Sequence, residues 1–174
     1  MRRAKKSMNL SLHRPLGLCL TLVLVSLAYS QGASDATLNA VRTSDRTDRA
    51  ANGKLAPDIT AAEHMRRGGV YMANRAFAPA REHYQAVVDN YPNDVNVPAA
   101  LYGLGRTYYQ ERRYEDARQL YEKVAHDYPQ TKEGREGANF AASSLLRMGR
   151  GAEAAARYAE YLQKYPNGER IDTA

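Results

Sequence analysis

Apolar and small side chains recur every 37 residues through the second half of this chain. The first set comprises Ala80, Tyr84 and the pair Tyr91-Pro92. The same types return as Ala117, Tyr121 and Tyr128-Pro129, and again as Ala154, Tyr158 and Tyr165-Pro166. A fixed period of this length is typical of stacked arrays, in which each unit buries its apolar face only against its neighbours.

Within each unit, the apolar spacing predicts two helices joined by a short turn. Thr60 and Glu63 match a capping box at the start of the first helix. Pro79 suits the first turn of its helix, and each Tyr-Pro pair ends a helix because proline cannot extend it. We therefore expect six helices, at about 60–74, 77–91, 98–111, 114–128, 134–148 and 151–165.

The middle unit resembles the tetratricopeptide repeat. The residues that carry the resemblance are Leu101, Leu104, Gly105, Tyr108, Ala117, Tyr121 and Pro129. The matching positions are Gly68, Tyr71, Ala80, Tyr84 and Pro92 in the first unit, and Ala142, Leu145, Ala154, Tyr158 and Pro166 in the third. The small residues suit close helix crossings, and Tyr84, Tyr121 and Tyr158 fill the wedge between successive pairs.

This resemblance covers residues 60 to 166. It implies an all-α, TPR-like right-handed superhelical solenoid of three helix pairs over residues 59–168, with repeats at about 61–97, 98–134 and 135–168. The pitch of 37 residues departs from the usual 34 and adds three residues to the turns between units.

Residues 1–30 have the pattern of a secretory signal peptide, with a basic stretch before an apolar run. The run covers residues 16–29, which is short against the ~20 residues of a bilayer span. Small residues at Ala28 and Ser30 predict cleavage near Ser30, with an uncleaved anchor as the alternative. Cys19 lies inside the run after Leu18, so a lipoprotein is not expected. We expect an exported, periplasmic chain without stable membrane insertion after cleavage.

Without the residues of the predicted leader, the chain has almost no net charge. Five of the 25 basic residues precede residue 31, and the other 20 nearly balance the 19 acidic residues. A nucleic-acid partner is therefore not expected. Residues 31–58 are polar without an apolar period, and we expect a disordered linker there.

No catalytic constellation is evident after the leader. His64, His83 and His126 share no metal-ligand spacing, and His64 occupies the slot of Leu101, which favours a structural role. Gly149 and Gly151 fall at a turn, and we expect them to relax that turn and not to bind phosphate. We expect no enzyme activity, no metal and no small-molecule cofactor.

Candidate binding residues lie on the first helix of each unit. In tetratricopeptide proteins, the positions of Tyr102, Arg106 and Tyr109 face the concave groove. The corresponding slots hold Met65 and Met72 in the first unit, and Asn139, Ser143 and Arg147 in the third. Tyrosine, methionine and arginine are favoured at protein interfaces. We expect a strip that binds a protein or peptide; the alternative is a solvated inner face.

In repeat style the chain is similar to bacterial envelope proteins of this family, among them the Tol-associated cell-division coordinator and the outer-membrane assembly lipoprotein. It lacks the coiled-coil arm of the first and the lipidated cysteine of the second. The resemblance implies a non-catalytic scaffold in the cell envelope. Residues 169–174 suggest the start of a truncated fourth repeat. The alternative is therefore a helical fragment of a larger exported enzyme, such as a peptidoglycan lytic transglycosylase.

Overall fold

The computed structural model describes residues 35–50 and 52–166, so the expected leader and the start of a fourth repeat lie outside it. The helices of the three expected pairs are α2 (Ala61–Ala73), α3 (Phe77–Asn90), α4 (Val97–Gln110), α5 (Tyr114–Asp127), α6 (Lys132–Arg147) and α7 (Gly151–Lys164). Every boundary lies within two residues of its expected position. In the described part, extended pairing is limited to the isolated bridge between Arg49 and Leu55. The fold is the expected all-α, TPR-like solenoid.

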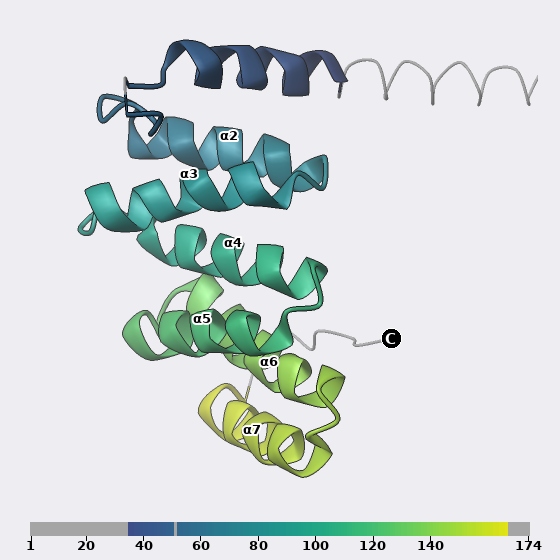
Figure 1. Ribbon diagram of the computed structural model, residues 1–174. Coiled ribbons are helices and arrows are strands. Elements are labelled where there is room, and N and C mark those ends of the chain that lie inside the picture. Colours follow the sequence, from purple (N-terminus) through teal and green to yellow (C-terminus); the bar gives the residue numbers. More distant parts are fainter. Residues whose placement is uncertain (1–34, 51, 167–174) are drawn as a thin grey trace, which may run out of the picture. The chain divides into compact units, whose positions relative to one another are not determined.

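The six helices stack in chain order (Figure 1). Each helix contacts the next one along the chain, and α4 also contacts α6. The first helices of the second and third units are therefore direct neighbours, and side chains from both contribute to one surface.

The close crossing of the two helices in each of the first two pairs requires a glycine on the first helix, where a larger side chain would meet a tyrosine ring. A Cβ atom added to Gly68 would lie 2.7 Å from the ring of Tyr84, and one added to Gly105 would lie 2.8 Å from the ring of Tyr121. Ala80 and Ala117, from the second helices, are completely buried. The predicted nesting of tyrosine rings against small residues is confirmed in these two units.

The turns inside the three pairs share one backbone conformation. Arg75, Arg112 and Gly149 follow one another at 37-residue intervals, with φ values of 57°, 63° and 77°. This left-handed region suits glycine and costs a residue with a Cβ atom about 1–2 kcal/mol. Gly149 therefore relaxes its turn, as the sequence predicted, while the first two units carry arginine at the same place.

Only one of the two hydrogen bonds of the predicted capping box at α2 is present. The Thr60 hydroxyl accepts a hydrogen bond from the Glu63 amide at 3.2 Å. The Glu63 carboxylate pairs instead with Arg66, at 2.7 Å, and with Arg67, at 2.6 Å. Those arginines draw the carboxylate away from the helix end.

The expected linker over residues 31–58 differs from what the structure shows. Residues 35–47 are helical. Leu38 begins the compact unit that contains α2 to α7, and Leu38 and Val41 belong to the core cluster with Ala61 and Tyr71. Val41 is only 2% exposed. Residues 38–47 therefore pack on the first repeat, because a few apolar side chains and a buried polar network hold them there.

Candidate functional site

Tyr102 and Tyr109, the predicted binding tyrosines of α4, pack against α6. The Tyr102 ring centroid lies 6.0 Å from that of Phe140 on α6, and the Tyr109 centroid lies 5.8 Å from it. Tyr121 of α5 completes this aromatic cluster, 5.4 Å from Phe140. Tyr102 and Tyr109 are half-buried. Part of each ring packs between α4 and α6, and only the remaining part is exposed to solvent.

The hydroxyl of Tyr109 brings two units together. It lies 3.1 Å from Ser143 Oγ and accepts a hydrogen bond from Arg147 Nε at 3.3 Å. These partners are 34 and 38 residues away in the sequence. Arg147 is exposed, so the tyrosine orients its guanidinium while leaving the remaining donors open to solvent.

Arg106 is the exposed cation between the two tyrosines. Burial raises the pKa of the Tyr102 phenol, and the nearby charge of Arg106 opposes that rise. Burial likewise raises the pKa of Tyr121, again opposed by Arg106. Among the described residues, no carboxylate forms an ion pair with Arg106 or Arg147.

We call Tyr102, Arg106, Tyr109 and Arg147 the α4–α6 strip. The other predicted members present less surface. Met65 and Met72 are half-buried and pack against the first core cluster. Asn139 is only 7% exposed. In the 37-residue register, the counterpart of Tyr109 is Leu146, which is 57% exposed, and Arg147 lies one residue beyond it.

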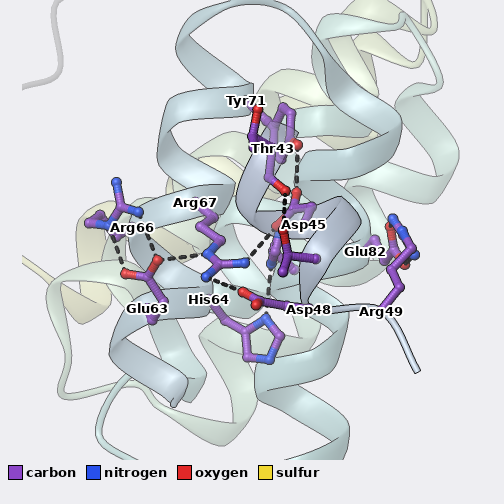
Figure 2. A network of polar contacts seen from close by, with 12 residues as sticks. Thr43, Asp45, Asp48, Arg49, Glu63, His64, Arg66, Arg67, Tyr71 and Glu82 are labelled. Carbon is purple, nitrogen blue, oxygen red and sulfur yellow. Dashed lines mark hydrogen bonds and ion pairs between the residues drawn. The ribbon is translucent and has the colours of Figure 1, made fainter. Parts of the chain in front are cut away.

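The structure also contains a polar network that the sequence did not predict (Figure 2). At its centre is Asp45, which is 4% exposed. Its carboxylate accepts hydrogen bonds from Arg67 at 2.8 Å and from the Tyr71 hydroxyl at 2.5 Å, and it lies 3.1 Å from His83 Nε2. Asp48 also pairs with Arg67, at 2.7 Å. This Asp45 network ties residues 38–48 to α2 and α3.

Electrostatics in the network favours an ionised Asp45. Burial alone would raise its pKa, but hydrogen bonds from Tyr71, Arg67 and His83 hold the pKa below its usual value. Burial and the hydrogen bond to Asp45 raise the pKa of the Tyr71 phenol. Removing one partner of a buried ion pair typically costs about 3–5 kcal/mol, because the other charge is left uncompensated.

A signal for this network was present in the repeat register. His64, Arg67 and His83 stand where the middle unit has Leu101, Leu104 and Leu120, 37 residues later. Buried polar side chains need partners. Three polar replacements at core positions of one unit therefore indicated that another segment supplies those partners. Asp45 itself carries no local pattern, so its identity was not predictable.

Other chemistry is not indicated in the part of the chain that the structure describes. No group of three or more histidine, cysteine, aspartate or glutamate side chains there is placed to hold a metal ion. Within residues 35–50 and 52–166, no helix has the length and apolarity needed to cross a membrane.

Comparison with known proteins identifies the repeats. Two family models, both described as tetratricopeptide repeat, match the chain, one over residues 65–131 and the other over residues 141–168. Together the matches include residues of all three helix pairs. A search of curated proteins found no match to this chain.

Proposed function

Because the chain belongs to the tetratricopeptide repeat family, we propose that it is a non-catalytic scaffold that binds a protein or peptide of the bacterial cell envelope through the α4–α6 strip. Repeats of this family suggest protein–protein interaction. The observation that carries the choice of surface is the convergence of Tyr109, Ser143 and Arg147 from two successive units.

The chemistry of the strip indicates what a partner must supply. Arg106 and Arg147 are exposed cations that form no ion pair with a carboxylate of the described residues, whereas Arg113, Arg118 and Arg150 each pair with at least one. Carboxylates or backbone carbonyls from a partner would satisfy their donors. The half-buried rings of Tyr102 and Tyr109 supply apolar surface that is already ordered, which lowers the entropic cost of binding.

The envelope setting rests on the leader pattern, which lies outside the described residues, and on the similarity in repeat style to bacterial envelope proteins. Cell fractionation and N-terminal sequencing of the mature chain test it. We expect the protein in the periplasmic fraction with an N-terminus near Gln31; a full-length chain in the cytoplasmic fraction would contradict the setting without touching the binding surface. No observation favours the alternative of a fragment of an exported enzyme.

Charge reversal tests the binding surface. The purified chain, immobilised, is used to capture partners from envelope extract, with Arg106→Glu and Arg147→Glu beside the unaltered protein. Arg112→Glu is the matched control, since Arg112 is also exposed, is not a member of the strip and lies in the turn after α4, where its backbone amide donates to the Tyr109 carbonyl at 3.0 Å. We expect at least ~10-fold weaker capture by both strip variants, which corresponds to the loss of more than ~1.4 kcal/mol at a central contact.

The control variant should capture the same partners as the unaltered protein, and circular dichroism should show equal helicity in all four proteins. Equal capture by all variants would remove the α4–α6 strip from the account. A loss in Arg112→Glu as large as that in Arg106→Glu would show that overall charge, and not this surface, governs binding.

A further inference from the structure

Two buried histidines face each other inside the first helix pair. His64 of α2 and His83 of α3 are each 1% exposed, and their Nδ1 atoms are 2.9 Å apart. The middle unit has Leu101 and Leu120 at the corresponding places, 37 residues later. Packing between paired helices of this chain therefore does not require imidazoles, and the histidine pair adds a property that the leucine pair lacks.

The contacts fix where the protons are. His83 Nε2 donates to the ionised Asp45 carboxylate, at 3.1 Å, so in neutral His83 the Nδ1 atom is an acceptor. His64 Nδ1 must then donate to it, which leaves His64 Nε2 without a proton. That atom is buried and has no hydrogen-bond partner among the described residues.

An added proton has no favourable place in this arrangement. Only one proton fits between the two facing Nδ1 atoms, so a protonated pair must carry an N–H group at His64 Nε2. No acceptor meets that group in the described residues, and a buried donor without a partner is costly. Opening the contact between α2 and α3 exposes His64 to water and removes the cost.

The neighbouring charges come from every element packed around the pair. From residues 38–48, Asp45 favours a charged histidine and touches His83 directly. On α2, Arg67 opposes the charge and Glu63 favours it at His64; on α3, Glu82 favours it at His83. Arg67 is itself bound by Asp45, Asp48 and Glu63. Asp45 and Glu63 are thus engaged by Arg67, and Glu82 is paired with Arg49, so these carboxylates do not offset burial.

We propose that the His64–His83 pair makes the first unit, formed by residues 38–47, α2 and α3, an acid-labile end of the solenoid that opens while α4 to α7 stay folded. In a stacked array each unit contacts only its neighbours, so an end unit can open locally. The remaining histidine of the described residues, His126, is on the surface with 89% of its side chain exposed. The inference does not depend on the binding function of the α4–α6 strip.

Linkage sets the direction and the pH window. Burial is the largest influence on both groups: it lowers the pKa of His64 from 6.5 to about 4 and lowers that of His83 as well. Between these pH values the opened unit binds protons and the closed unit does not, so closure weakens as the pH falls from about 6.5 to about 4. For His64 alone, the opening equilibrium constant rises about 30-fold between pH 7.5 and 5. Asp45, with its lowered pKa, remains ionised across this window.

Hydrogen exchange of the purified chain, corrected for the intrinsic pH dependence of the exchange rate, tests this proposal. Amide protection in α2 and α3 should fall by about 30-fold or more between pH 7.5 and 5, while protection in α5 and α6 changes little. Unchanged protection in the first unit would overturn the proposal. An equal fall in every helix would also overturn it, because the opening would then be global.

The double variant His64→Leu/His83→Leu reproduces the pair found in the middle unit and should abolish the pH dependence. A pH-dependent fall that persists in this variant would assign the effect to other groups. A second measurement does not require the variant to fold: NMR of the imidazole resonances in the unaltered chain. We expect His64, whose pKa burial lowers to about 4, to remain neutral at pH 5, and titration of His64 near the ordinary histidine value of 6.5 would contradict the proposal.

Discussion

Two buried tyrosine hydroxyls show how the surroundings of a side chain decide its contribution. Tyr71 donates to the Asp45 carboxylate at 2.5 Å. Tyr121 is completely buried, yet its hydroxyl has no hydrogen-bond partner among the described residues. The ring of Tyr121 is needed to fill the space beside Gly105, while its hydroxyl gains nothing from burial.

These environments predict opposite results for the same substitution. Tyr71→Phe should lower the free energy of unfolding by about 1.5–3 kcal/mol, because a hydrogen bond to a buried charged group is lost. Tyr121→Phe should leave the free energy of unfolding unchanged or raise it slightly, because a buried hydroxyl without a partner is removed. Urea denaturation at pH 7.5 measures both, and a larger loss for Tyr121→Phe would mean that its hydroxyl has a partner in solution.

At the scale of helices and turns, the sequence predicted the features that are determined by residues close together in the chain. The Tyr-Pro pairs, Pro79 and the capping residue Thr60 act on their own neighbours, and the ends of α2 to α7 were predicted to within two residues. Residues 38–47 were not predicted to be ordered, because Leu38 and Val41 are too few to indicate an amphipathic helix. Their order depends on Asp45 contacts with residues 22 to 38 positions away.

For the candidate site, the sequence predicted which residues share a helix face but not how exposed each of them is. The register placed Tyr102, Arg106 and Tyr109 on one helix face, and the structure adds the bond from Arg147 to Tyr109. The burial of Asn139 was not predictable, because it depends on how α6 packs against its neighbours. Register gives the position of a side chain on its own helix, but its exposure depends on the packing of other helices.

The turns between paired helices offer a stabilising change. Arg112 is exposed and has a φ of 63°, in the region that Gly149 occupies in the third unit. Arg112→Gly should raise the free energy of unfolding by about 0.5–1 kcal/mol, since the relief of left-handed strain exceeds the added entropy of glycine. Gln110→Gly, at the last helical residue of α4, is the matched control and should be neutral or destabilising. A loss of stability in Arg112→Gly would show that this turn is not strained.

On the scale of the whole molecule, helix pairs nest through side chains at fixed 37-residue intervals. The nesting of Tyr84 and Tyr121 against Gly68 and Gly105 sets the helix spacing. That spacing in turn brings α4 beside α6 and creates the proposed binding strip. The first unit uses the same backbone plan but replaces part of its apolar contact with the Asp45 network and the histidine pair.

One comparison tests this nesting most directly: the free energies of unfolding of Gly105→Ala and Gly69→Ala. Both substitutions add one Cβ atom inside a helix, where alanine is favoured by about 0.8–1 kcal/mol. At Gly105 the new atom would lie 2.8 Å from the buried Tyr121 ring, whereas at Gly69 nothing lies within 4 Å. We predict that Gly105→Ala loses about 1–2 kcal/mol through overpacking, while Gly69→Ala gains stability. Equal stabilisation of the two variants would contradict the claim that small residues at fixed positions hold the units together.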